Sequence, residues 1–575
     1  MKKQLLAASL ILSTLGASAA IDARWQWTRT LNAGAAVMSN VGAVVPANGG
    51  GYFISGDFSK SAEVAWDDLS VAPSEAMTFA YQKNFMIARL NSDGSLKWHV
   101  VPELANAANN SISIASTPDG GVVMACNATC NGKSGLGWPV LMTLAGTDGN
   151  KVTVSYDDAP EDVSAYVGVI IKFSADGVVE WHSLVKGDPY ADDDKTVSDT
   201  NPVAVNGIAA DSEGNIFIGG YYKTTVDFGN GVTAPKALNG NVANGKVADN
   251  GDAFIACYDA AGNAVKVLVN GGDAPYAAKE SVSGLAVSGD RLYCAAIVNG
   301  LDGAAYSFMG RDADISATVP ANIVYGVIDC KTMECVGAGA LKAVVSEEVT
   351  THNAQIQGVE VAGSNLYICG SLQGGFEQNG RLVAMSTGLY PATGKYGLEN
   401  MTVAVSAESL EVANVYLGGK AIGADTYAIE CASANRLYTY GYLMGEATAS
   451  LREYDLTTGE LLDDNVLYGN VSSVKGACFN NETKQFLATC YAKGLTGIAG
   501  DGADTQTFTA FHGFLTSFSL PGLDATSGLT RVATADAGLS QPEYFSLQGI
   551  RIANPAPGQI VIRRQGGVAE KLVVR

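Results

Sequence analysis

The sequence predicts an all-β protein made of seven repeated four-stranded sheets packed around a common axis, a seven-bladed β-propeller. Three observations lead to this prediction. A short apolar pattern recurs seven times along the 575 residues. Gly-rich and Asp-Gly turns separate the apolar runs. Charged residues make up 16% of the chain, whereas about 25% is usual, and this low content argues against a protein of long helices.

The repeated pattern consists of three mostly apolar residues followed by two residues that are usually small. Its seven copies begin at Tyr52, Val122, Ile216, Leu292, Leu366, Leu437 and Phe486. An apolar segment precedes several copies, and further strand-like runs follow after a variable insertion, so each unit is read as four antiparallel strands. One such short sheet cannot bury both of its faces alone. Seven of them packed face to face can, which predicts the propeller.

The N-terminal segment is expected to close the ring. Two predicted fourth strands contain Trp98-His99 and Trp181-His182, and residues 24–31 contain the similar Trp25-Gln26-Trp27. The last unit offers only three strands before Pro521. We therefore expect residues 24–31 to form the outer strand of the last blade, which leaves no open sheet edge between the first and last blades. An open stack of sheets and a pair of β-sandwiches are the alternatives.

The chain divides into three segments. Residues 1–20 are read as a secretory signal peptide, because two lysines precede an apolar stretch and small residues follow it. Residues 21–522 are predicted to form the propeller, and residues 523–575 a linker and a short C-terminal β tail. No later apolar stretch is long enough to predict a transmembrane helix. We expect an exported protein, located in the periplasm or at the cell surface.

Ten cysteines are too few for a disulfide scaffold, although export permits disulfide bonds. Cys330 and Cys335 flank a predicted hairpin turn and are candidates for a bridge across it. Cys126 and Cys130 are a second local candidate pair. The other cysteines lie in or beside apolar runs, where a small buried side chain is the expected role. No spacing of cysteines and histidines predicts a zinc site.

The sequence contains no recognisable catalytic, cofactor or metal motif. Its four histidines, His99, His182, His352 and His512, are scattered along the chain. Two acidic runs, at 157–162 and 188–199, lack the alternating ligand spacing of a calcium loop and are expected to be solvated. The formal charge of −21 argues against nucleic acid and anionic membrane surfaces as partners.

The third unit resembles the repeat of the bacterial seven-bladed β-propeller repeat family. The resemblance lies in Gly214-Asn215-Ile216-Phe217-Ile218-Gly219-Gly220, Thr225-Val226-Asp227-Phe228-Gly229 and Gly251-Asp252-Ala253-Phe254-Ile255-Ala256. It implies the fold and an exported location but no activity, because propellers host many unrelated functions. Residues 541–575 carry five basic residues against two acidic ones and contain three short strand-like runs, at 544–552, 559–563 and 571–575. This tail resembles the sorting tail used with type IX secretion, which implies sorting to the cell surface. The alternative is a small terminal β-element docked on the propeller.

We therefore expect a monomeric, non-catalytic binding or scaffold protein whose partner is a protein, a glycan or another envelope component. Loops on rigid scaffolds often carry recognition, so the insertions are expected to form one binding face. These insertions lie at residues 59–83, 127–167, 222–252, 298–322 and 372–400. The first alternative is a hydrolase or lyase with carboxylates in the central channel. The second is a structural envelope component without a specific ligand.

Overall fold

The structure is a computed structural model. It describes residues 24–32, 39–59, 64–66, 69–71, 83–105, 112–130, 139–163, 165–190, 194–195, 198–199, 201–237, 242–243, 246–247, 251–270, 280–299, 306–390, 393–469, 471–497, 505–520, 543–545, 551–552, 560–565 and 568–573. The predicted signal peptide and the predicted linker before the tail lie outside these residues.

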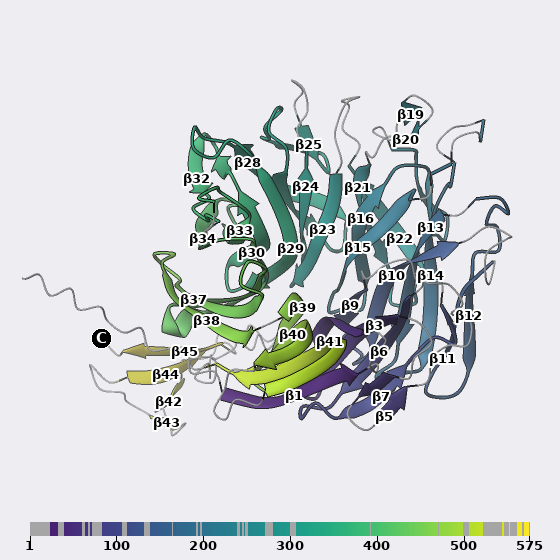
Figure 1. Ribbon diagram of the computed structural model, residues 1–575, viewed down its shortest axis with the longest axis horizontal. Coiled ribbons are helices and arrows are strands. Elements are labelled where there is room, and N and C mark those ends of the chain that lie inside the picture. The colour runs from purple at the N-terminus through teal and green to yellow at the C-terminus, as the bar shows by residue number, and fades with distance from the viewer. Residues whose placement is uncertain are drawn as a thin grey trace, which may run out of the picture.

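Seven four-stranded antiparallel sheets are arranged as blades around one axis, which confirms the predicted propeller (Figure 1). Given from the inner to the outer strand, blade 1 consists of β2 (Ser39–Ala47), β3 (Gly51–Ser59), β6 (Lys83–Leu90) and β7 (Leu96–Val100); blade 2 of β9 (Ser113–Ser116), β10 (Val122–Cys130), β13 (Ala165–Phe173) and β14 (Val179–Gly187); blade 3 of β15 (Val203–Ala210), β16 (Ile216–Tyr222), β21 (Asp252–Tyr258) and β22 (Ala264–Val269); and blade 4 of β23 (Glu280–Ser288), β24 (Arg291–Val298), β27 (Asn322–Asp329) and β28 (Glu334–Val344). Blade 5 consists of β29 (Asn353–Ala362), β30 (Asn365–Gln373), β33 (Glu399–Ser406) and β34 (Val412–Ala421); blade 6 of β35 (Gly423–Cys431), β36 (Arg436–Leu443), β37 (Thr448–Asp455) and β38 (Leu461–Gly469); and blade 7 of β39 (Val471–Asn480), β40 (Gln485–Gly497), β41 (Thr505–Ser519) and β1 (Arg24–Asn32).

The two sides of the ring are built differently. On one side, here named the turn side, short turns join the first strand of a blade to the second and the third strand to the fourth. Aspartates hold several of these turns: Asp211, for example, accepts the backbone N–H groups of Glu213 and Asn215 at 2.9 Å. On the opposite side, here named the insertion side, the variable insertions join the second and third strands. The inner strand of every blade therefore begins on the insertion side.

The N-terminal strand closes the ring as predicted. β1 pairs antiparallel with β41, from Arg24 opposite Ser519 to Leu31 opposite Gly513. The hydrophobic core lies between the blades rather than within them, because each buried cluster joins the facing sides of neighbouring sheets. At the junction of the chain ends, Tyr52 of blade 1 and Leu487 of blade 7 belong to one such cluster, and both are fully buried. Closure thus buries apolar surface in addition to pairing two strands.

Three insertions fold into short hairpins that extend the outer strand of the preceding blade. β4 (Val64–Trp66) and β5 (Leu69–Val71) continue the sheet of blade 7 beyond β1. β17 (Val226–Gly229) and β18 (Val232–Ala234) continue blade 2 beyond β14. β31 (Gly375–Gln378) and β32 (Arg381–Met385) continue blade 4 beyond β28. We call these three hairpins the bridging hairpins, since each one spans two neighbouring blades.

Two of the bridging hairpins have a packing role. Phe228 of β17 and Phe376 of β31 are fully buried, and the Phe228 ring lies 5.2 Å from that of Phe254 in blade 3. Blades of a ring diverge with distance from the axis, so a space opens between their outer strands, and these hairpins fill it. The bridging hairpins of insertions 222–252 and 372–400 are therefore packed structural elements, and the expectation that the insertions form one binding face stays a prediction.

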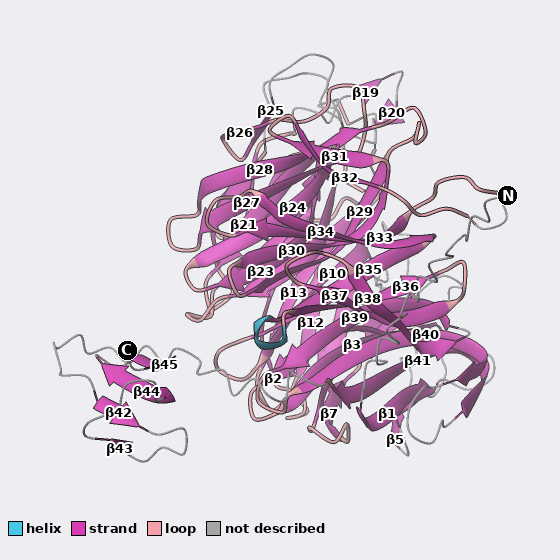
Figure 2. Cartoon of the chain, turned by 90° about the vertical axis from the view of Figure 1, so that its left-hand side faces the viewer, coloured by secondary structure: helices cyan, strands magenta, loops and turns pink. Residues whose placement is uncertain are grey.

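The remaining described strands form small sheets. β8 (Leu104–Ala105), β11 (Val140–Ala145) and β12 (Lys151–Ser155) form one of them, and β19 (Val242–Ala243) with β20 (Lys246–Val247) and β25 (Tyr306–Phe308) with β26 (Arg311–Ala313) form two hairpins. The tail forms its own sheet from β42 (Glu543–Phe545), β43 (Arg551–Ile552), β44 (Ile560–Gln565) and β45 (Val568–Val573). Figure 2 shows this sheet apart from the blades, and none of its described strands pairs with a blade strand.

Helical structure is almost absent from the described residues. They contain a single turn of 3-10 helix, at Ala432–Ala434. None of their helical segments has the length and apolar character needed to cross a bilayer.

Candidate functional site

The four cysteines that were proposed for disulfide bonds are free, buried thiols in the structure. Cys126 and Cys130 lie on the same strand, β10, four residues apart. A strand rises about 3.3 Å per residue, so about 13 Å separates their Cα atoms, well beyond the reach of a disulfide. A bridge between these two cysteines is therefore incompatible with this strand. The two cysteines are close in sequence, but β10 continues as a strand through Cys130 and so keeps them apart.

Cys330 and Cys335 lie at the predicted hairpin, but they are not directly opposite each other. Cys335 in β28 pairs with Ile328 of β27, whereas Cys330 lies in the turn. Burial raises the pKa of the Cys330 thiol to about 11 and that of the Cys126 thiol to about 12. These thiols are therefore protonated and poor nucleophiles at neutral pH.

The histidines and acidic runs are spread over the ring. His99 and His182 occupy equivalent positions on the outer strands β7 and β14, opposite Ala88 and Ile171. In the acidic runs, Asp162 accepts a hydrogen bond from the hydroxyl of Tyr190 at 2.9 Å, which joins the two runs at the insertion side of blade 2. Within the described residues, no three His, Cys, Asp or Glu side chains come close enough together to hold a metal ion.

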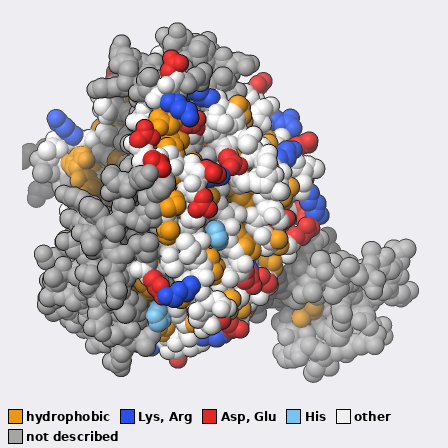
Figure 3. Space-filling view, turned by 90° about the vertical axis from the view of Figure 1, so that its right-hand side faces the viewer, with side chains coloured by type: hydrophobic (Ala, Val, Ile, Leu, Met, Phe, Trp, Pro, Cys, Tyr) orange, Lys and Arg blue, Asp and Glu red, His pale blue; other side chains and the backbone are white. Residues whose placement is uncertain are grey.

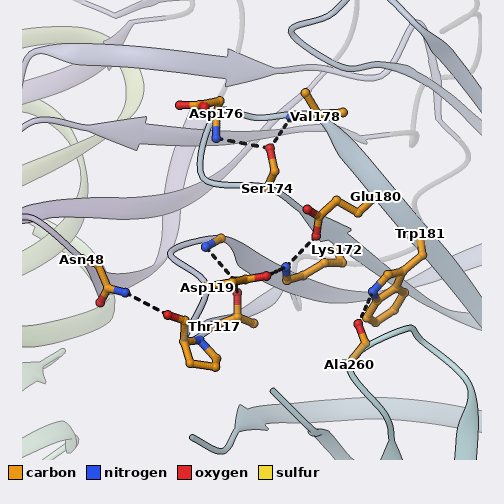
Figure 4. A network of polar contacts seen from close by, with 12 residues as sticks. Asn48, Thr117, Asp119, Lys172, Ser174, Asp176, Val178, Glu180, Trp181 and Ala260 are labelled. Atoms are coloured by element: carbon orange, nitrogen blue, oxygen red, sulfur yellow. Dashed lines mark hydrogen bonds and ion pairs between the residues drawn. The ribbon is translucent and has the colours of Figure 1, made fainter. Parts of the chain in front are cut away.

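The outer wall of blades 1 to 3 shows no single kind of side chain gathered in one place. Figure 3 views the side that carries β11 to β14 in Figure 1, and acidic, basic and apolar side chains are interspersed over its described surface. Figure 4 shows that polar groups here hold the structure together: the buried Lys172 contacts Asp119 at 2.6 Å and Glu180 at 2.7 Å. The inner strands, which surround the axis, differ from this wall.

Six of the seven inner strands, all but β9 of blade 2, carry a bulge at an equivalent position. The strand pairing shifts register after Val205, Val282 and Ile356, and again after Val41, Asp425 and Val474. A bulge inserts an extra residue that the ladder leaves unpaired. In blades 3, 4 and 5 this residue is Asn206, Ser283 and Gln357, respectively, and in blade 7 the ladder skips both Lys475 and Gly476. Polar side chains therefore lie at this level in four of the blades.

Glycine follows the extra residue in these blades, and in blades 4 and 5 it is required because the bulge touches the inner strand of the next blade. A Cβ atom on Gly284 would lie 2.5 Å from Cγ2 of Val359, and one on Gly358 would lie 2.1 Å from the carbonyl oxygen of Thr426. Larger residues at these two positions would force the blades apart. The two contacts hold blades 4, 5 and 6 together beside Ser283 and Gln357.

Further polar residues extend this level toward the insertion side. Both faces of an inner strand are covered by the neighbouring blades, so an exposed side chain on it points to the axis or to its open end. Asn353, Gln355, Gln357, Ser472 and Lys475 are exposed, and Asn206, Ser281 and Ser283 are half-buried. We name these eight residues the axial collar. Seven of the eight carry an uncharged amide or hydroxyl group.

Beyond the bulge, toward the turn side, the inner strands continue with apolar residues such as Val44, Ile208 and Val359. These side chains are buried in the clusters between neighbouring blades. Glu360 is an exception. Burial raises the pKa of its carboxyl group to about 8, so this group is mostly protonated at neutral pH. The site therefore consists of a mostly uncharged polar collar at the insertion-side end of the inner strands, with the Glu360 carboxyl group further along β29.

Sequence reasoning did not find the axial collar. The repeated triplets Val205-Asn206-Gly207, Val282-Ser283-Gly284, Ile356-Gln357-Gly358 and Val474-Lys475-Gly476 were the available signal. They precede the apolar pattern that identified the blades. The direction of the middle residue of each triplet depends on the bulge, however. In a regular strand this residue would face a neighbouring blade.

Comparison with known proteins adds a general similarity of shape. No protein-family model matches the chain, and no curated protein matches its sequence. Among solved structures, the Dos1 propeller is similar at 10% identity over 86% of this chain and 95% of that chain, with a TM-score of 0.39. A europium-containing methanol dehydrogenase is similar at 11% identity over 87% of this chain and 93% of that chain, with a TM-score of 0.35. Hydrazine synthase of Kuenenia stuttgartiensis is similar at 10% identity over 52% of this chain and 64% of that chain, with a TM-score of 0.29.

These similarities carry no argument about function, so the assignment of the fold depends on the strand pairing of this chain. The resemblances to the bacterial repeat family and to the sorting tail remain predictions.

Proposed function

We propose that this protein is an exported, non-catalytic binding or scaffold protein at the cell surface or in the periplasm, and that it binds its partner at the insertion-side end of its axis. The axial collar is the observation that carries this proposal. Its exposed polar side chains lie at one end of the ring, where blade-to-blade contacts hold the bulges of Ser283 and Gln357 in place, and such pre-positioned polar groups favour binding. The N-terminal sequence and the net charge of −21 support an exported protein that does not bind nucleic acid.

The described inner strands carry few ionisable side chains that could act in catalysis at the axis. Glu280 and Asp425 also lie on inner strands but are fully buried between blades, and Glu430 accepts a hydrogen bond from Tyr367 at 2.6 Å. Among the acidic and basic side chains of the described inner strands, this leaves Glu360 and Lys475 free to face the axis. A hydrolase or lyase would be favoured by three or more ionisable groups converging there.

Two measurements test the proposal. Protease treatment of intact cells, followed by mass spectrometry, reports whether the propeller is exposed at the cell surface and whether residues after about 540 remain. Saturable binding of the purified protein to cell envelopes from the same organism tests its binding role. A protein found in the cytoplasm would contradict the export part of the proposal. Broad, non-saturable association with the envelope would favour a structural component without a specific ligand.

A further inference from the structure

We propose that the axial collar binds the end of an uncharged oligosaccharide. This inference rests on the proposed function, because it assigns a ligand class to the same end of the axis. Its basis is the combination of two features at one place: three exposed side-chain amides of blade 5 that no side-chain hydrogen bond ties to another described residue, and further polar side chains that arrive from blades 3, 4 and 7.

The collar side chains are available to a ligand. Asn353, Gln355 and Gln357 are exposed on β29: Asn353 and Gln355 share one side of the strand, and Gln357 is the residue that the bulge leaves unpaired. No side-chain hydrogen bond ties any of the three to another described residue. By contrast, the amide of Asn206 donates to the hydroxyl of Ser281 at 2.8 Å. A ligand can therefore bond the three amides of blade 5 without first breaking a bond inside the protein.

The chemistry of the collar matches sugar hydroxyls. Each side-chain amide offers two N–H donors and one carbonyl acceptor, and each serine hydroxyl is both donor and acceptor. Sugar hydroxyls also donate and accept, so adjacent hydroxyls can bond both halves of one amide. Anionic ligands are disfavoured by a net charge of −21. Lys475 is the one charged member of the collar and adds further N–H donors.

The arrangement favours a sugar over an extended peptide. The collar residues come from blades 3, 4, 5 and 7, so their polar groups approach the axis from several directions. Hydroxyl groups likewise radiate around the rim of a sugar ring. An extended peptide presents its backbone N–H and C=O groups in two opposite directions, and would leave part of the collar unpaired.

The test compares two treatments of cell envelopes from the source organism, using the purified full-length mature protein. Periodate oxidises sugars that carry adjacent hydroxyl groups and cleaves the C–C bond between those two carbons. Proteinase K removes envelope proteins. We expect saturable binding that is lost after periodate and retained after proteinase K. Neutral oligosaccharides released from the same envelopes should compete for binding, whereas acidic ones should not.

Three variants link the result to the collar. We expect Gln355→Ala and Gln357→Ala each to weaken binding about fivefold, the loss of roughly one hydrogen bond, and the double variant to weaken it about twentyfold. Gln26→Ala is the matched control, because Gln26 is exposed on the outer strand β1, and it should bind as the wild type does. Circular dichroism should show the same fold for all four proteins.

These outcomes distinguish a failure of the oligosaccharide assignment from a failure of the proposed binding function. Binding that is lost after proteinase K and kept after periodate would overturn the oligosaccharide assignment and leave the binding function standing. Glycan binding that the collar variants do not change would also overturn the assignment. The absence of any saturable binding to envelopes would overturn both the inference and the proposed function.

Discussion

The indole Nε1 of Trp181 donates a hydrogen bond to the carbonyl oxygen of Ala260, 3.0 Å away, and so joins the outer strand of blade 2 to a turn of blade 3 (Figure 4). The same bond recurs between blades 1 and 2, where Trp98 donates to Ala175 at 2.9 Å, and between blades 7 and 1, where Trp27 donates to Ser92 at 2.8 Å. Three neighbouring blade pairs, including the one that closes the ring, therefore share one contact.

Gly262 is the residue on which the contact between blades 2 and 3 depends. It has a φ of +83°, and a Cβ atom there would lie 2.5 Å from carbons of the Trp181 ring. We expect Gly262→Ala to lower the free energy of unfolding by about 2 kcal/mol or more, because backbone strain and the displaced indole add. Gly310→Ala is the matched control, since Gly310 has a φ of +82° with open space around it. Urea unfolding of both variants isolates the tryptophan contact; equal losses would show that the indole moves aside at no cost.

The bridging hairpins should contribute to the stability of the whole ring. Phe228→Ala removes a fully buried ring from the contact between blades 2 and 3, and we expect a loss of about 3–5 kcal/mol in the free energy of unfolding. Leu382→Ala is the control, because Leu382 lies on another bridging hairpin but is 56% exposed. It should change stability by less than about 0.5 kcal/mol. A loss of similar size in both variants would contradict the packing role.

Glu280 should make stability depend on pH in an unusual direction. Its carboxyl group is fully buried and accepts a hydrogen bond from the amide of Asn270, with Asp252, Tyr306 and Tyr222 nearby. Burial, with the charge of Asp252 adding to it, raises the pKa of Glu280 from 4.5 to about 8. The folded protein therefore holds a proton that the unfolded chain releases between these pH values, and stability should fall as pH rises through this window.

Glu280→Gln tests this dependence, because glutamine has the shape of the protonated acid but cannot ionise. We expect wild type and variant to unfold at similar urea concentrations near pH 5, and the variant to become the more stable protein as pH approaches 9. Glu360 shares the same direction of shift and stays in both proteins, so part of the dependence should remain. Parallel stability curves across the whole range would contradict the raised pKa of Glu280.

Ring closure predicts a specific defect in a shortened chain. A protein that begins at residue 39 lacks β1, so the edge of β41 that pairs with it is left open. Open strand edges recruit other chains, and we expect this protein to dimerise or aggregate in size-exclusion chromatography with light scattering, while the intact mature chain is monomeric. Removal of residues 543–575 is the control, since no described tail strand pairs with a blade. A monomeric chain without β1 would show that closure is dispensable.

The sequence was sufficient to predict features that repeat. Seven copies of one apolar pattern predicted the blades, and the tryptophan shared by residues 24–31 and the outer strands predicted the closure. It did not predict the bridging hairpins, because their pairing joins distant residues such as Lys186 and Asp227. No sequence pattern within either strand indicates which other strand it pairs with. The axial collar was missed for a related reason: whether Gln357 faces the axis or the next blade depends on a bulge that exists only in the paired sheet.

The closing strand also sets the order in which the molecule can be completed. β1 lies near the start of the chain, yet its partner β41 ends at Ser519, so nearly the whole protein must be synthesised before the first strand finds its place. The bridging hairpins impose the same delay blade by blade, because the sheet of blade 2 is finished only by a segment of blade 3. During synthesis the unfinished ring always carries an open edge. Folding that is delayed until the last blade has emerged therefore avoids exposing this edge to other chains.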